Sequence, residues 1–290
     1  MELPQAKSAL TPKSELPWSS RDAFIRLILF YGLLLVFMVT FQLGFTGLIK
    51  NVDDFVLEAL IVGIIGVILT FIFLSFDGKK FSNIGFSLHS QKYFLLVVAL
   101  IATPISLGLA YIIEIAGNVV SVDQMMKDRY LIENLASPDQ FLNYFVVVII
   151  TFVGIAVGEE IMFRGYIQNI LNSQLSFLKA TAITSILFGF VHSFLLLNAS
   201  ADRLQGMVAV GVSATIFGFV FSYASKLTDN NLTLPILIHG VWDSIIFFFN
   251  TNYNYHDLIN ISAEIGSQLV AAIVLLLILY AVKRYSSSIN

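Results

Sequence analysis

The chain has 290 residues, of which 57% are hydrophobic and 12% charged, and its mean hydropathy is +0.85. Soluble domains carry about 25% charged residues, so this composition excludes an ordinary soluble protein and predicts a membrane protein with several spans. The net charge of −3 argues against nucleic acid as a partner, and the absence of cysteine excludes disulfides, thiolate metal sites and a cysteine nucleophile.

The chain divides into a short polar tail and a long apolar region. We expect residues 1–21, which contain three prolines, to form a disordered cytoplasmic tail, and residues 22–284 to form a single transmembrane helical domain. A helix needs about 20 apolar residues to cross a membrane. The segments that meet this requirement are 22–49, 54–76, 92–116, 139–160, 178–197, 205–225, 234–250 and 264–283. The predicted fold class is therefore an all-α polytopic membrane bundle of about eight transmembrane helices.

The distribution of basic residues predicts the orientation of this bundle. Lys and Arg favour the cytoplasmic side of a membrane. With the N-terminus inside, twelve of the 16 basic residues fall in inside segments and four in outside segments. This bias predicts that both ends of the chain are cytoplasmic. We also expect the fourth helix to continue beyond Glu159 to about Asn172.

Ionisable side chains within membrane spans are costly, so each one is a hypothesis for function. Glu58 and Glu114 lie near span ends, and we expect them to reach the membrane interface. The other six concentrate in three short motifs and are Glu159, Glu160, Arg164, His192, His239 and Asp243.

The first motif, "GEEIMFRG", carries two adjacent glutamates. Neighbouring residues on a helix point about 100° apart, so Glu159 and Glu160 cannot share one role on one face. Glu160 and Arg164 are four residues apart and can pair. Glu159 is then free to face a cavity, where nearby charges set its basicity, as general-base chemistry requires.

The other two motifs, "LFGFVHS" and "LPILIHGVWDS", each carry a histidine. His239 and Asp243 are four residues apart and share a helix face. A lone histidine in a membrane span is more often a hydrogen-bond partner between helices than a catalyst. Two histidines and a glutamate from three helices, however, can converge on one water molecule. The combination therefore favours a water-activating site.

Other hydrolytic chemistries have weaker support in the sequence. The zinc motif HExxH and paired aspartates within spans are both absent. "GVSATIFG" faintly resembles a GxSG serine site at Ser213, but small residues at this spacing usually mark close helix packing. Glu159, His192 and His239 would supply a His₂Glu zinc set. We expect no cofactor and keep zinc on these three residues as the alternative.

The three motifs together resemble those of a known family. "EEIMFR" fits EExxxR, "FGFVH" fits FxxxH and "HGVWD" fits Hxxx(N/D), in the order found in the CPBP family, also called Abi or CAAX-protease-like. This family of intramembrane glutamic endopeptidases includes the type II CAAX prenyl endopeptidases. The resemblance covers a core of about residues 139–250. It implies an eight-helix bundle with a cavity opening toward the cytoplasm.

The resemblance also implies a role for each motif residue. Glu159 would be the general base that activates water, assisted by His192. Glu160 and Arg164 would support that site, and His239 would stabilise the oxyanion. Asp243 departs from the pattern, because CAAX endopeptidases commonly have Asn there and an ionised Asp only accepts hydrogen bonds. Asp243 is then either protonated or accepts a ring N–H from His239, and the shared helix face favours such a partner role.

The predicted function is therefore an intramembrane endopeptidase acting on a peptide or protein substrate within the lipid bilayer. We expect an integral protein of a prokaryotic cell (inner) membrane, with the active-site cavity facing the cytoplasm. A proton-coupled transporter is an alternative, because intramembrane Glu, His and Asp also relay protons, although no inverted repeat is evident. A non-catalytic membrane scaffold or immunity protein, as some family members are thought to be, is another.

Overall fold

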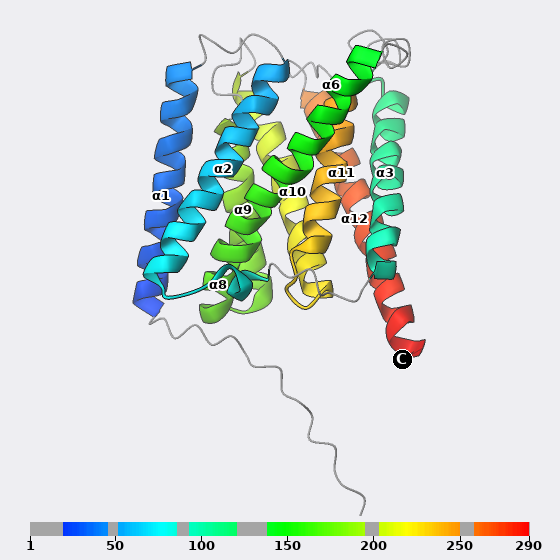
Figure 1. The fold of residues 1–290 in the computed structure, drawn as a ribbon. Coiled ribbons are helices and arrows are strands. Elements are labelled where there is room, and N and C mark those ends of the chain that lie inside the picture. The colour runs from blue at the N-terminus through cyan, green and yellow to red at the C-terminus, as the bar shows by residue number, and fades with distance from the viewer. Residues whose placement is uncertain are drawn as a thin grey trace, which may run out of the picture.

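The computed structural model describes residues 20–45, 52–85, 93–120, 138–194, 203–249 and 258–289. Within these ranges all the regular elements are helices, which confirms the all-α class (Figure 1). Helices satisfy their backbone hydrogen bonds internally, as an apolar environment requires. Residues 1–19 of the predicted tail and the side chain of Glu58 lie outside the described part.

The long helices match the predicted segments closely. They are α1 (Ser20–Phe45), α2 (Val52–Phe76), α3 (Tyr93–Ala116), α6 (Pro138–Ile149), α9 (Phe177–Ser193), α10 (Arg203–Leu227), α11 (Thr233–Phe249) and α12 (Leu258–Ile289). Five of the described helices are long and apolar enough to cross a membrane. Three shorter apolar stretches are Leu60–Phe76, Phe177–Ser193 and Thr233–Ile246. Each predicted segment is thus helical, while length and composition establish five of them as candidate spans.

The helix that carries the two glutamates is continuous from residue 138 to residue 174 but is not regular. After α6, the segments η2 (Ile150–Ala156) and η3 (Ile161–Ile167) have π-helical hydrogen bonding. Between them lies a single α turn, α7 (Val157–Glu160), and after them comes α8 (Gln168–Gln174). The predicted extension to about Asn172 is confirmed. The π segments were not predicted, and π-helical turns within α-helices are frequent at functional sites.

Glycines bring α2 into direct contact with this helix. A Cβ atom on Gly158 would lie 2.6 Å from the Cα of Gly63, and one on Gly63 would lie 2.4 Å from the carbonyl oxygen of Gly154. Small residues permit this close approach of backbones in membrane helices. Because α2 covers one side of α7, the glutamate side chains point to the other side, toward α9, α10 and α11.

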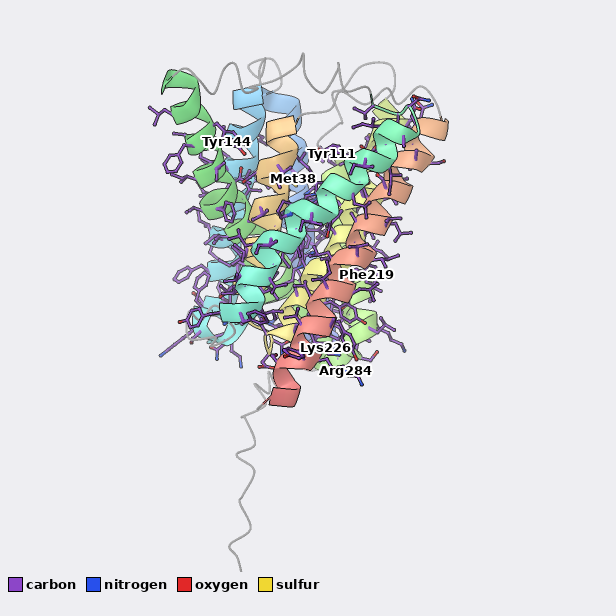
Figure 2. The ribbon with its side chains drawn as sticks, turned by 90° about the vertical axis from the view of Figure 1, so that its right-hand side faces the viewer. Met38, Tyr111, Tyr144, Phe219, Lys226 and Arg284 are labelled. Carbon is purple, nitrogen blue, oxygen red and sulfur yellow. The ribbon has the colours of Figure 1, made fainter. Side chains whose placement is uncertain are left out.

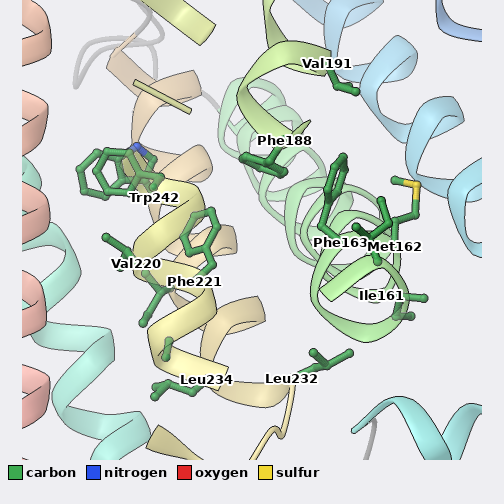
Figure 3. Packing of buried hydrophobic residues seen from close by; sticks show 14 of the residues in the cluster. Ile161, Met162, Phe163, Phe188, Val191, Val220, Phe221, Leu232, Leu234 and Trp242 are labelled. Atoms are coloured by element: carbon green, nitrogen blue, oxygen red, sulfur yellow. The ribbon is translucent and has the colours of Figure 1, made fainter. Parts of the chain in front are cut away.

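An aromatic core fills the space between these helices (Figure 3). The rings of Phe163 and Phe188 meet edge-to-face with centroids 4.9 Å apart, and Phe221 of α10 lies 6.1 Å from Phe188. The outer surface of the bundle is also apolar, with exposed side chains such as Ile28 and Val153. An apolar exterior of this extent suits contact with lipid rather than water.

Several helix ends and turns of the chain gather at one end of the bundle. The first residues of α1 and the last of α12 lie at the same end, together with the α8–α9 and α10–α11 turns (Figure 1). Lys226 and Arg284 also lie at this end (Figure 2). The 3₁₀ helix η1 (Phe81–Ile84) is tied to the α10–α11 turn, because Leu232 N–H donates to the carbonyl of Gly85 at 3.1 Å.

Glu114 does not reach the interface, and this prediction was wrong. Its side chain is fully buried, and Ser267 Oγ of α12 donates to its Oε1 at 2.5 Å. Glu264, also on α12, is buried as well. The physical reason is that α12 begins at Leu258, six residues before the predicted span, so that it covers the end of α3.

Candidate active site

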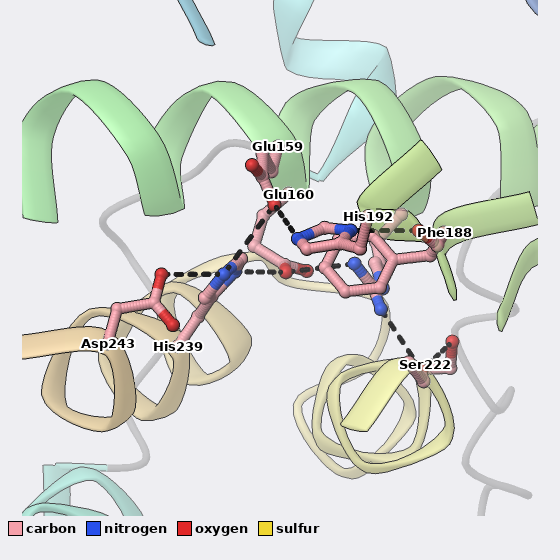
Figure 4. A network of polar contacts seen from close by, with 9 residues as sticks. Glu159, Glu160, Phe188, His192, Ser222, His239 and Asp243 are labelled. Atoms are coloured by element: carbon pink, nitrogen blue, oxygen red, sulfur yellow. Dashed lines mark hydrogen bonds and ion pairs between the residues drawn. The ribbon is translucent and has the colours of Figure 1, made fainter. Parts of the chain in front are cut away.

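Glu160 forms the centre of a buried polar network (Figure 4). Its Oε1 accepts a hydrogen bond from Arg164 Nη1 at 3.0 Å, so the pair expected from the sequence is present. The same oxygen lies 2.8 Å from His239 Nδ1, which comes from α11. One carboxylate oxygen of Glu160 therefore contacts both Arg164, one turn later on the same helix, and His239, which lies 79 positions farther along the sequence than Glu160.

A carboxylate, a backbone carbonyl and two aromatic rings surround the guanidinium of Arg164. Its Nη2 donates to the carbonyl oxygen of Gly218 at 3.1 Å, and the side chain has no exposed surface. Its Cζ lies 4.4 Å from the ring centroid of Phe188 and 5.0 Å from that of Phe221. A planar cation between two aromatic rings and a carboxylate is well stabilised. The guanidinium therefore contacts protein groups and has no exposed surface.

Glu159 faces the two histidines. Its Oε2 lies 3.5 Å from His192 Nε2 of α9 and 3.6 Å from His239 Nε2 of α11. These distances are longer than ordinary hydrogen bonds, and this buried oxygen makes no hydrogen bond to a protein group within the described residues. Glu159 thus points one oxygen at two imidazoles without being closely paired to either.

A backbone contact fixes the proton position of neutral His192. Its Nδ1 lies 2.8 Å from the carbonyl oxygen of Phe188, one turn earlier. Because a carbonyl only accepts, Nδ1 carries the hydrogen and Nε2 has the free lone pair. The four-residue spacing of Phe188 and His192 therefore turns Nε2 of the imidazole toward Glu159.

Carboxylates flank both ring nitrogens of His239. Nδ1 meets Glu160, and Nε2 lies 3.2 Å from Asp243 Oδ2, one turn later on the same helix. The ring stacks on Phe221 with centroids 4.5 Å apart and an interplanar angle of 17°. Asp243 therefore lies where it can accept a ring N–H from His239, which is the partner geometry considered from the sequence.

The structure brings all six predicted site residues into one cluster. Sequence reasoning missed Phe221 and the carbonyl of Gly218, both on α10, because neither carries an ionisable group. It also missed the contact between Glu160 and His239. Ser213 gains no support as a nucleophile, since its buried Oγ makes no hydrogen bond to a protein group, and therefore none to a base, in the described part.

The zinc alternative stays an untested prediction. Among the residues that the structure describes, no group of three or more His, Cys, Asp or Glu side chains has an arrangement able to hold a metal ion. This geometry therefore adds no support for a metal on Glu159, His192 and His239.

Comparison with known proteins identifies the region that contains the cluster. Residues 141–245 match the family model described as Type II CAAX prenyl endopeptidase Rce1-like. The match covers about a third of the chain, includes all six predicted residues and confirms the resemblance seen in the three motifs. No curated protein and no solved structure matches the chain. The family match favours a peptidase over a transporter or a scaffold.

Proposed function

We propose, from the Rce1-like domain at residues 141–245, that this protein is an intramembrane endopeptidase that hydrolyses a peptide bond with a glutamate-activated water. One observation carries the proposal: Oε2 of Glu159 faces Nε2 of both His192 and His239, at 3.5 and 3.6 Å. A weakly paired carboxylate beside two imidazoles is suited to accept a proton from water.

In the first step, Glu159 removes a proton from a water molecule as its oxygen attacks the carbonyl carbon of the substrate. His192 assists, because its Nε2 lone pair accepts a hydrogen bond from the same water or from the protonated Glu159. The new C–O bond gives a tetrahedral intermediate with a negative oxygen. Groups placed in advance to stabilise that charge contribute strongly to catalysis.

His239 stabilises the oxyanion. When both ring nitrogens carry hydrogen, the Nδ1–H donates to Glu160 and the Nε2–H points into the space shared by Asp243 and Glu159. Glu160 and Arg164 keep the ring in place, and Asp243 holds the second N–H until the substrate arrives. Glu159 then gives its proton to the leaving amine, and the C–N bond breaks to release the two products.

We place the site in a bundle of eight membrane crossings with both ends of the chain in the cytoplasm. The common end of α1 and α12 supports an even number of crossings (Figure 1). Lys226 and Arg284 at that end support its cytoplasmic location. The partly exposed side chains of the cluster, His192 at 18% and Asp243 at 22%, mark the side from which substrate approaches.

The substrate is a peptide or protein chain, and the family description makes a prenylated CAAX peptide the first probe. Purified protein in liposomes is given a fluorogenic farnesylated CAAX peptide, its unprenylated counterpart and a quenched peptide library. Wild-type protein should cleave at least one of them, and Glu159→Gln should lower the rate by about 10²–10⁴-fold, the usual contribution of a general base. Equal cleavage by wild type and Glu159→Gln would rule out this mechanism.

A further inference from the structure

The helix face that carries Glu160 and Arg164 continues as a row of polar residues. Gln168 and Asn172 follow Arg164 at four-residue intervals and lead toward the α8–α9 turn. Gln168 is only 3% exposed. The row therefore runs from the buried Arg164 and Gln168 to the half-buried Asn172 at the α8–α9 end of the bundle.

The facing side of α9 is polar over the same stretch. Gln168 Nε2 donates to Thr181 Oγ1 at 3.4 Å. Thr184 and Ser185 follow one turn later and, like Thr181, have no exposed surface. Farther along this face, Phe188 covers Arg164. Thr181 thus faces α8, whereas Ser185 lies against Gly218 of α10, the residue whose carbonyl accepts a hydrogen bond from Arg164.

Where α8, α9 and α10 meet, several buried polar atoms make no hydrogen bond to a protein group in the described part of the chain. Buried polar atoms nearly always have a partner, and leaving one without costs about 1–3 kcal/mol. The following atoms make no hydrogen bond to a protein group in the described part of the chain: Gln168 Oε1, Asn172 Oδ1, Thr184 Oγ1, Ser185 Oγ and Arg164 Nε. We call these five residues, with Thr181, the polar strip.

The hydroxyl groups of the polar strip differ from others in the same bundle. A hydroxyl inside a helix usually bonds to the carbonyl four residues earlier. Thr103, Ser106, Thr151 and Ser222 all do so, at 2.7–2.9 Å. The hydroxyls of Thr184 and Ser185 do not, so they remain able to bind something that lies between the helices.

We propose that the polar strip is a binding site for ordered water that connects the α8–α9 end of the bundle with Arg164 and Glu160. Buried water typically makes about three hydrogen bonds to polar groups that lack other partners, which is what these side chains offer. As a supply of water to the active site, the polar strip rests on the proposed function, because a hydrolase enclosed by lipid-facing helices needs a route for water. Its existence does not depend on that function.

The chain contains no cysteine, so a single introduced thiol can report on water. Thr184→Cys places it in the strip, and Ala224→Cys places it in apolar packing on α10, where Ala224 is equally buried. Both variants are treated with Ag⁺ in sealed proteoliposomes, and the remaining thiol is counted after denaturation. Only hydrated thiol ionises and reacts readily, so Thr184→Cys should react at least about ten-fold faster than Ala224→Cys.

Adding Gln168→Leu to Thr184→Cys should return the reaction to the slow rate of Ala224→Cys, because leucine offers no hydrogen bond to water. Equally slow reaction of Thr184→Cys and Ala224→Cys with Ag⁺ overturns the polar strip as a water-binding site, even if the enzyme cleaves peptides normally. If Thr184→Cys reacts fast with Ag⁺ but the wild-type protein cleaves no peptide, the water-binding site is supported and the proposed function is refuted. The two proposals therefore fail separately.

Discussion

His239 Nδ1 lies 2.8 Å from Glu160 Oε1, and this contact joins the first and last motifs of the site. Both glutamates consequently face the same imidazole, Glu160 at Nδ1 and Glu159 at Nε2. From the sequence, Glu160 was expected to pair with Arg164 alone. The structure makes it the residue that fixes the position of His239 as well.

Replacing Glu160 should destabilise the protein strongly. Glu160→Ala leaves Arg164 buried without its carboxylate, and removing one member of a buried ion pair costs about 3–5 kcal/mol. We expect a clear fall in the midpoint of thermal unfolding in detergent, and a smaller fall for Glu160→Gln, which keeps an oxygen acceptor. A Glu160→Ala protein with the wild-type midpoint would contradict the network described for Arg164.

Asp243 should tolerate Asn better than Ala. Glu160 already orients His239 through Nδ1, so Asp243 is not alone in holding the ring. The amide oxygen of Asn still accepts the Nε2–H, whereas Ala removes the acceptor. We expect Asp243→Asn to lower kcat by less than about ten-fold, unlike a triad aspartate that alone fixes the tautomer, and Asp243→Ala to lower it further. An equally large loss with Asn and with Ala would show that the charge of Asp243, not its acceptor oxygen, matters.

Phe221 should matter for activity although it carries no reactive group. Its ring stacks on His239 and covers the guanidinium of Arg164. Phe221→Ala opens space beside both, and small displacements of catalytic groups can lower rates by about a hundred-fold. Phe219→Ala is the matched control, because Phe219 lies on the same helix, is half-buried and is not part of this stack. Equal kcat/KM values for the two variants would exclude a positioning role for Phe221.

Much of this arrangement was predictable from local sequence pattern. The helical segments follow from runs of apolar residues, and the Glu160–Arg164 and His239–Asp243 contacts follow from four-residue spacing. The contacts between distant segments were not predictable in this way. Phe221 gave no signal because aromatic residues are common throughout the chain, with 26 phenylalanines. Glu114 was misplaced because its burial depends on where α12 begins.

The π segments around Glu159 illustrate the same limit. Apolar residues such as those of η2 and η3 are compatible with α or π hydrogen bonding, so composition cannot separate the two. The direct contact of Gly63 with Gly154 of η2 and Gly158 of α7 joins distant segments of the chain, and composition does not show it either.

Activity should survive metal chelators. The proposed mechanism relies on Glu159 and the two histidines, and no HExxH pair is present to hold zinc in advance. The peptide assay is repeated after treatment with EDTA or 1,10-phenanthroline, and the rate should stay within about two-fold of the untreated enzyme, less than the loss expected on removing a catalytic zinc. Loss of activity that returns on adding Zn²⁺ would instead support the zinc alternative on Glu159, His192 and His239.

The contact between α2 and the glutamate helix should tolerate no added methyl group. In Gly158→Ala the new Cβ would lie 2.6 Å from the Cα of Gly63, a backbone atom that cannot turn aside. The two helices must therefore separate, which moves the adjacent Glu159 away from the histidines and lowers both stability and kcat. Gly108→Ala on α3 is the control, since nothing lies within 4 Å of its added Cβ, and alanine favours a helix over glycine by about 1 kcal/mol. Thermal unfolding and peptide cleavage are measured on both proteins. If Gly158→Ala were as stable and active as Gly108→Ala, α2 would not be what positions Glu159.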